Sequence, residues 1–142
     1  MSTPPIFQAS HVTIRVADLD RAEAFYAGVL GFSTARRGKP DSAFSKILGS
    51  PPDAEISMAA MTNGDFHIEL VQAGGERDSA PAAQAGLRHL GLRVADLDAA
   101  IAAIEGGGGR LDAASRLSTD SGRFAICLDP EGVRLLLMER AA

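Results

Sequence analysis

Two segments of the chain share one pattern of apolar and polar positions. In residues 11–16 the apolar side chains alternate with polar ones, and this period of two predicts a strand. Apolar residues then recur every three or four positions up to Leu30, which predicts an amphipathic helix ended by Gly31. The same pattern returns at residues 89–109, with a helix expected over about 98–105. The two 21-residue segments, HVTIRVADLDRAEAFYAGVLG and HLGLRVADLDAAIAAIEGGGG, are identical at 11 positions, which indicates a duplicated unit.

Further strands are predicted after each helix. In the first half they are expected at about 32–37, 55–62 and 66–72, with a hairpin signal at Asn63-Gly64. In the second half they are expected at about 110–116, 123–128 and 133–139, with a turn at Asp129–Gly132. Each half is thus a βαβββ module of the α+β class. One module buries only one face of its sheet, so we expect both to pack as a single domain: module one at about 8–72, a linker at 73–86 and module two at about 87–140.

An acidic residue stands near the start of the first predicted helix. Asp18 or Asp20 can accept hydrogen bonds from the open N–H groups there. Asp20-x-x-Glu23 also has the form of a capping box. The helix is therefore expected to begin close to these residues.

The strand alternation also predicts which side chains share a face. The helix is expected to cover the apolar side of the first strand, so its polar residues point to the other, concave side. The side chains expected to face this concavity are His11, Thr13 and Arg15 in the first strand, and His67, Glu69 and Val71 in the strand at 66–72. In the second half they are His89, Gly91 and Arg93, with Arg134, Leu136 and Met138 in the last strand.

Histidines and a carboxylate on one concave face suggest a metal centre. Two imidazoles and one carboxylate suit Fe, Mn, Ni or Zn and leave positions open for water or substrate. The alternative for each single histidine is a structural, hydrogen-bonded role. His67 shares the face of Glu69 and is a candidate general acid or base, or else an exposed residue at a sheet edge.

Composition narrows the classes of function. With 14 basic and 18 acidic residues the formal net charge is −4, so no basic surplus favours nucleic acid or an anionic membrane. The only cysteine, Cys127, cannot form an internal disulfide, and no targeting or membrane-spanning segment is recognisable, so we expect a cytoplasmic domain. The basic run of Arg36, Arg37 and Lys39 is either a solvated loop or part of a pocket for an anionic substrate.

Four motifs carry a family resemblance. The segments HVTIRVADLDRAEAFYAGVLGF, HIELVQ, HLGLRVADLD and DPEGVRLLL, in this order, resemble the glyoxalase I, bleomycin-resistance and extradiol dioxygenase group, the vicinal oxygen chelate superfamily. The resemblance covers about residues 8–140. It implies paired βαβββ modules that form a curved, partly open mixed β-sheet barrel, and, in single-domain members, a homodimer.

The resemblance also implies roles for individual residues. The first strand of each module gives a metal-binding histidine in this family, matched here by His11 and His89. The I-E-L motif of the last strand gives a glutamate, matched by Glu69. In the second module Leu136 occupies that position, so the fourth protein ligand of a glyoxalase-like site is missing; Glu139 has the opposite strand parity and should face away. Arg15 matches a position at which glutathione-dependent glyoxalases bind a substrate carboxylate.

Two hypotheses of function follow from these residues. The first is a metal-dependent lyase, isomerase or dioxygenase acting on a small, vicinally oxygenated substrate. Its metal ligands would be His11, Glu69 and His89, with Glu69 and His67 acting in catalysis. The second is a metal-free, bleomycin-resistance-like binding protein, because Leu136 and Met138 make the pocket more apolar and the net charge suits a cationic ligand.

Overall fold

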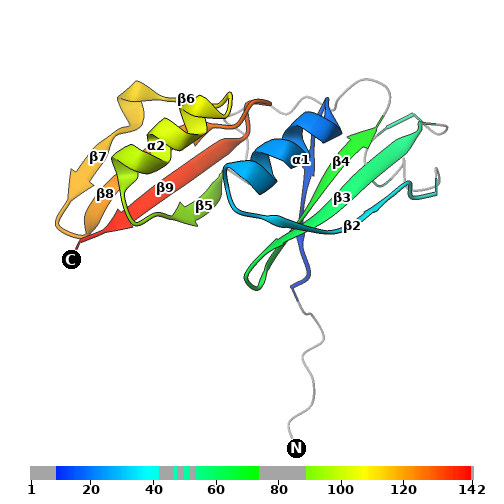
Figure 1. The fold of residues 1–142 in the computed structure, drawn as a ribbon, viewed down its shortest axis with the longest axis horizontal. Coiled ribbons are helices and arrows are strands. Elements are labelled where there is room, and N and C mark those ends of the chain that lie inside the picture. Colours follow the sequence, from blue (N-terminus) through cyan, green and yellow to red (C-terminus); the bar gives the residue numbers. More distant parts are fainter. Residues whose placement is uncertain (1–8, 42–46, 48–49, 52–53, 74–88, 142) are drawn as a thin grey trace, which may run out of the picture. The chain divides into compact units, whose positions relative to one another are not determined.

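The computed structural model describes residues 9–41, 47, 50–51, 54–73 and 89–141. The predicted linker therefore lies almost wholly outside the described residues. The first half contains, in order, β1 (Val12–Arg15), α1 (Leu19–Gly28), β2 (Ser33–Gly38), β3 (Ile56–Asn63) and β4 (Phe66–Ala73) (Figure 1). The second half contains β5 (Leu90–Arg93), α2 (Leu97–Gly106), β6 (Arg110–Leu111), the 3₁₀ helix η2 (Ala113–Ser115), β7 (Leu117–Thr119), β8 (Gly122–Leu128) and β9 (Arg134–Arg140). The α+β class is confirmed, with a strand–helix unit opening each half.

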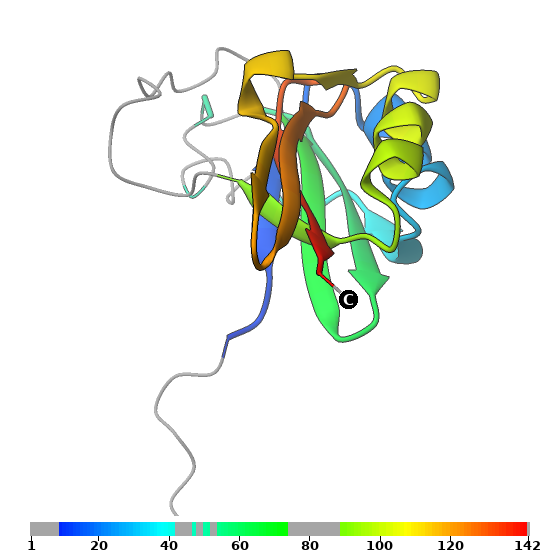
Figure 2. The ribbon, with the colours of Figure 1, turned by 90° about the vertical axis from the view of Figure 1, so that its left-hand side faces the viewer.

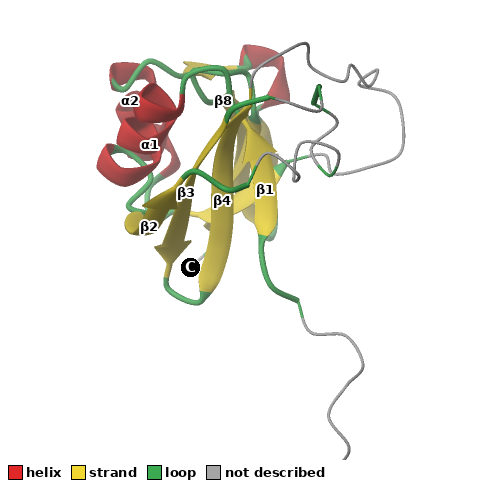
Figure 3. Cartoon of the chain, turned by 90° about the vertical axis from the view of Figure 1, so that its right-hand side faces the viewer, coloured by secondary structure: helices red, strands yellow, loops and turns green. Residues whose placement is uncertain are grey.

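The first sheet has the strand order β1-β4-β3-β2, and all four strands are visible in Figure 3. Strand β1 runs parallel to β4, whereas β3 is antiparallel to both of its neighbours. The register places Thr13 beside Glu69, Glu69 beside Ala60, and Ala60 beside Arg36. Because side chains alternate between faces along each strand, these four residues form one row on one face of the sheet.

The second sheet repeats this arrangement, in the order β5-β9-β8-β6, with β7 also paired to β8. Strands β8 and β9 run side by side in the orange and red part of Figure 2. Parallel pairing of β5 with β9 places Leu136 beside Gly91, just as Glu69 lies beside Thr13 in the first sheet. Leu136 is therefore the positional equivalent of Glu69, as the sequence alignment of the two modules predicts.

The prediction of a single continuous strand at 110–116 is wrong. Pairing with β8 stops after Leu111, and the chain then forms the helix η2 before β7 begins. The Asp112 carboxylate accepts a hydrogen bond from the Ala114 N–H, and the Ser115 hydroxyl oxygen accepts one from the Ile126 N–H at 2.7 Å. Short polar side chains thus replace the ladder hydrogen bonds that a continuous strand would have made with β8.

In each half, a side chain of the last strand accepts a hydrogen bond from the first N–H group of the helix. The Leu19 N–H donates to the Gln72 amide oxygen at 2.8 Å, and the Leu97 N–H donates to the Glu139 carboxylate at 2.6 Å. Since α1 begins at Leu19, Asp20 lies in its first turn, not at its cap, so the proposed capping box is wrong. In α2 the cap is Asp96, which accepts from the Ala99 N–H.

The chain forms two compact units whose limits differ from those of the repeat. One unit comprises Met1–Leu19 and Phe32–Glu76, and the other comprises Asp20–Gly31 and Arg77–Ala142, so α1 groups with the second sheet. In the first unit Ile68 and Leu70 are buried on one face of β4; in the second Leu135 and Leu137 are buried on the same face of β9. None of the helices within the described ranges is both long and apolar enough to cross a membrane.

Candidate functional site

The first sheet brings His11 and Glu69 into direct contact. His11 immediately precedes β1, and Glu69 lies in the middle of the neighbouring parallel strand β4. The two side chains share a face, and His11 Nε2 lies 3.0 Å from Glu69 Oε2. The side chains are 37% and 23% exposed, so both are accessible to a small ligand. The predicted convergence of these two residues is therefore present within the first unit.

Neighbouring polar groups hold this pair in place. The Ser10 hydroxyl is hydrogen-bonded to His11 Nδ1 at 2.9 Å, which turns Nε2 toward Glu69. On the other side of the carboxylate, Arg36 Nη2 lies 3.8 Å from Glu69 Oε1. Glu69 thus lies between an imidazole and a guanidinium group.

Arg36 reaches Glu69 because of two local features. The register of β2 against β3 shifts between Thr34 and Arg36, so Ala35 is an extra residue in a β-bulge. The shift places Arg36 opposite Ala60, in the same row as Glu69. Because the side chain of Ala60 is only a methyl group, the arginine can extend across it. Sequence reasoning missed this contact, since the bulge has no clear signal in the sequence.

Two cavities meet at this cluster and share His11, Arg36 and Glu69 as lining residues. The first has a volume of about 580 Å³ and also contains the polar side chains Ser10, Asp65 and His67. The second has a volume of about 630 Å³ and is mainly apolar at its base, with basic residues beside it. The His11–Glu69 pair therefore lies at the junction of a polar and an apolar space, each large enough for a small molecule.

The other predicted site residues have different positions. His67 is exposed and lines the polar cavity, so β4 brings it to the same face as Glu69, as predicted. Arg15 is half-buried in β1 and is absent from the lining of both cavities. His89 is exposed and belongs to the second unit, where it precedes β5. Within the described part of the chain, no group of three or more His, Cys, Asp or Glu side chains is placed to hold a metal ion, so the three-ligand site stays a prediction.

The apolar candidates lie on the second sheet. Leu136 and Met138 are half-buried in β9, beside Gly91 and Arg93 of β5 respectively. Their positions match the predicted face. No cavity among those described above includes them.

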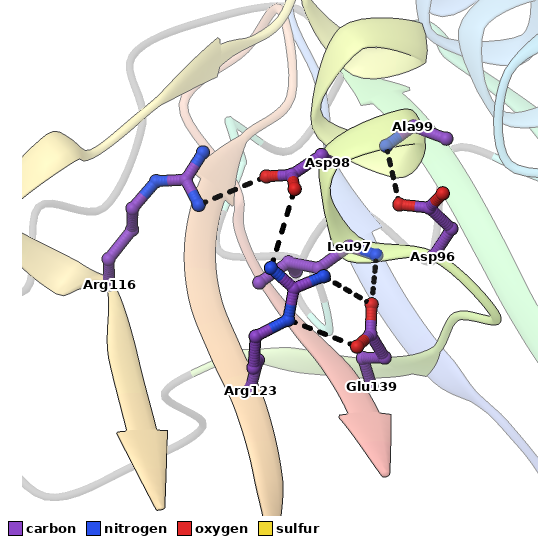
Figure 4. A network of polar contacts seen from close by, with 7 residues as sticks. All are labelled: Asp96, Leu97, Asp98, Ala99, Arg116, Arg123 and Glu139. Atoms are coloured by element: carbon purple, nitrogen blue, oxygen red, sulfur yellow. Dashed lines mark hydrogen bonds and ion pairs between the residues drawn. The ribbon is translucent and has the colours of Figure 1, made fainter. Parts of the chain in front are cut away.

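Glu139 has a structural role, as its strand parity predicts. Its carboxylate accepts two hydrogen bonds from Arg123, at 2.8 and 3.0 Å, besides the Leu97 N–H (Figure 4). These hydrogen bonds lower the pKa of Glu139 below its ordinary value. Arg123 also bonds to Asp98, which is paired in turn with Arg116 (Figure 4). This network anchors the start of α2 to β8 and β9, so Glu139 cannot replace the missing ligand at Leu136.

Comparison with known proteins agrees with the fold and with the resemblance. The sequence model of the Glyoxalase/Bleomycin resistance protein/Dioxygenase superfamily matches residues 8–137. The chain is 32% identical over 135 residues to the uncharacterized protein YaeR of Escherichia coli (strain K12), covering 94% of this chain and 96% of that protein. Among solved structures, a glyoxalase family protein from Bacillus cereus superposes with a TM-score of 0.80 at 21% identity, over 100% of this chain and 99% of that one. The trypanothione-dependent glyoxalase I of Leishmania major gives a TM-score of 0.64 at 23% identity, over 91% of this chain and 84% of that one. The chain therefore belongs to the Glyoxalase/Bleomycin resistance protein/Dioxygenase superfamily.

Proposed function

We propose that this protein is a divalent-metal-dependent enzyme acting on a small, vicinally oxygenated substrate, by lyase, isomerase or dioxygenase chemistry. The observation that carries the proposal is the 3.0 Å separation of His11 Nε2 and Glu69 Oε2 at the junction of two cavities. Two ligands bound to one metal at about 2.1 Å and at a right angle lie about 3.0 Å apart. The donor types and their separation therefore fit adjacent ligands of Fe, Mn, Ni or Zn.

The proposed metal ligands are His11, Glu69 and, from the second module, His89. A bound divalent metal would supply Lewis acidity at adjacent oxygens of the substrate, or would orient O2 and a diol. Ser10 would keep the imidazole of His11 in the orientation that leaves Nε2 to the metal, because it holds Nδ1. His67, in the polar cavity, would accept or donate a proton at a ring nitrogen.

Metal analysis tests the proposal directly. Protein purified without chelators should contain close to one equivalent of metal per chain, and a tightly bound ion should raise the melting temperature by mass action. His11→Ala, Glu69→Gln and His89→Ala should each weaken metal binding at least about tenfold. His67→Ala is the matched control, since it removes an imidazole from the same face without removing a ligand. Below about 0.2 equivalents, with no thermal shift on adding Mn, Fe(II), Ni or Zn, the proposal fails.

The second candidate is a metal-free binding protein of the bleomycin-resistance type. Arg36 favours it, because the guanidinium near Glu69 partly neutralises the carboxylate without any metal. The same measurement separates the two candidates, since a binding protein should keep its fold and its ligand after chelator treatment. Either candidate is compatible with the homodimer implied by the resemblance. Light scattering should then give twice the chain mass of 14.8 kDa.

A further inference from the structure

Strand β9 of the second unit carries a half-buried arginine, Arg134, with an unsatisfied donor. Its Nε atom is buried and has no hydrogen-bond partner among the described residues. Arg134 lies on the face of β9 opposite the buried side chains of Leu135 and Leu137. Most buried polar groups in folded proteins are hydrogen-bonded, so an unpaired guanidinium N–H favours a group from outside the chain that accepts from it.

A second arginine lies in the same row of this sheet. Arg134 is paired with Leu128 of β8, and Leu128 is paired in turn with Arg110 of β6. Residues paired in this way share a face, and two strand spacings separate the backbones of the arginines by about 10 Å. Two arginine side chains can together span this distance, so both guanidinium groups can reach one anion above Leu128.

The face that holds this row carries four arginines and no carboxylate within the described strands. The register places on it Arg93, Arg110, Arg134 and Arg140. The one acidic residue in the described strands of this unit, Glu139, lies on the opposite face, where it bonds to the Leu97 N–H. This face is therefore positive although the formal net charge of the chain is −4, and it attracts anions.

The ion pairs of the second unit leave these four arginines out. In the described part of this unit, the carboxylates of Glu131, Asp98 and Glu139 are paired with three other arginines, Arg21, Arg116 and Arg123. The guanidinium groups of Arg110 and Arg134 thus keep their donors for a ligand.

The equivalent row of the first sheet contains no arginine. Arg134 precedes Leu136 by two residues, as His67 precedes Glu69, and the first-sheet row continues with Thr62 and Ser33. The first module thus has a carboxylate where the second has a leucine, and the second module has arginines where the first has neutral hydroxyls and a histidine. The groups of the second sheet suit an anion and those of the first suit a cation.

An apolar surface adjoins the two arginines. Leu128, Leu136 and Met138 are half-buried on the same face of β8 and β9, so part of each side chain stays accessible. An apolar group of a ligand can rest on this surface while its charged end contacts Arg110 and Arg134.

We propose that this face of the second sheet binds the carboxylate of a small organic acid, with Arg110 and Arg134 as partners of the carboxylate and Leu128 and Leu136 under the apolar part. Arg134 Nε then donates to a carboxylate oxygen. The other two arginines of the face lie at the far end of the strands, level with Met138 or beyond it, so the four form no continuous track for a nucleic-acid backbone.

This inference goes beyond the proposed enzyme, because none of its residues is a proposed metal ligand. It also replaces the expectation of a cationic ligand beside Leu136 and Met138, which the net charge alone suggests. The local charge on their face has the opposite sign.

Four small probes test the charge preference and the apolar contact: hexanoate, its neutral analogue hexanamide, the cation hexylamine, and acetate. Binding is followed by NMR titration of chelator-treated protein. Hexanoate should bind at least about fivefold more tightly than hexanamide, and hexylamine should bind most weakly. Acetate should bind at least about threefold more weakly than hexanoate, because it lacks most of the apolar chain. The amide shifts should lie in β6, β8 and β9.

Variants assign the preference to the two arginines. Arg134→Gln and Arg110→Gln should each bring the hexanoate-to-hexanamide ratio toward one, and the second removes an exposed side chain, so that the fold is kept. Arg140→Gln is the matched control, since it removes an exposed arginine from the other end of the same face and should leave the ratio unchanged.

Several results would overturn the inference: equal affinity for acid and amide, an unchanged ratio in Arg110→Gln and Arg134→Gln, shifts confined to the first unit, or tighter binding of a single-stranded oligonucleotide than of hexanoate. Because the titrations use chelator-treated protein, their failure leaves the proposed metal centre untouched. Absence of metal in untreated protein contradicts the proposed enzyme and leaves the anion site standing.

Discussion

Removing the buried hydrogen bond between Tyr26 and Asp129 should destabilise the second unit by a predictable amount. Tyr26 is 0% exposed and Asp129 1% exposed, and the phenol donates to Asp129 Oδ2 at 3.0 Å. The other carboxylate oxygen accepts from the backbone N–H groups of Glu131 and Val133, at 2.8 and 2.9 Å. One carboxylate therefore holds both a core tyrosine and the turn between β8 and β9.

The magnitudes follow from the number of partners that each substitution leaves unsatisfied. Tyr26→Phe removes one donor and leaves Asp129 its two backbone partners, so we expect a loss of about 1–2 kcal/mol. Asp129→Ala removes all three bonds and leaves buried donors without acceptors, so we expect about 3–5 kcal/mol. In the double variant the Tyr26 bond is lost only once, so the combined loss should fall short of the sum by about 1 kcal/mol.

Urea denaturation followed by circular dichroism measures these values. Asp120→Ala, in the exposed turn before β8, is the control and should change stability by less than about 0.5 kcal/mol. Additivity of the two substitutions within about 0.3 kcal/mol would refute the reasoning, because the hydrogen bond would then contribute nothing.

Three further outcomes are expected. Acid should weaken the fold through Glu139. The hydrogen bonds from Arg123 hold the pKa of Glu139 in the folded protein below the ordinary value of 4.5. The stabilisation that ionised Glu139 gives the fold is therefore present above pH 4.5 and is lost as the pH falls through the lower, folded-state pKa. Arg123→Ala should therefore flatten the fall of the urea midpoint between about pH 5 and pH 3, and an unchanged slope would contradict the assignment. Gly122→Ala should cost about 3 kcal/mol or more in urea denaturation, because φ is +149° and a Cβ would clash with the Glu139 carbonyl. Gly64→Ala, at φ +58° with open space around it, should cost only about 1 kcal/mol, and equal losses would argue against the clash. Cys127 is buried and burial raises its pKa, so a disulfide reagent should label it only upon unfolding; rapid labelling of the native protein would contradict that burial.

Part of the site could be predicted because strand periodicity is local. A period of two places His67 and Glu69 on one face of β4 wherever that strand lies in the sheet. The same rule places Glu139 on the other face of β9, where it bonds to Leu97 and Arg123. The contact between His11 and Glu69 also needs the parallel pairing of β1 with β4, which strand periodicity does not predict. The family resemblance implied only that the two residues share a metal site.

Other features depend on contacts that no local pattern encodes. The bulge at Ala35 decides that Arg36 lies beside Glu69, and it arises from the register of two strands far apart in the sequence. The break after Leu111 depends on Ser115 bonding to Ile126, again across two strands. The grouping of α1 with the second sheet reflects side chains such as Tyr26, whose partner Asp129 is 103 residues away. Tertiary contacts therefore decide these features.

The two modules keep the same backbone register but differ in the side chains of one row. In the first sheet this row is Thr13, Glu69, Ala60 and Arg36, and it carries a carboxylate between an imidazole and a guanidinium group. In the second sheet the equivalent row begins with Gly91, Leu136 and Ile126, which carry no charge. The pairing of the helix start with the last strand persists in both, through Gln72 and Glu139. The duplicated features are thus those needed for folding, whereas the carboxylate of Glu69 has no counterpart at the equivalent position, Leu136.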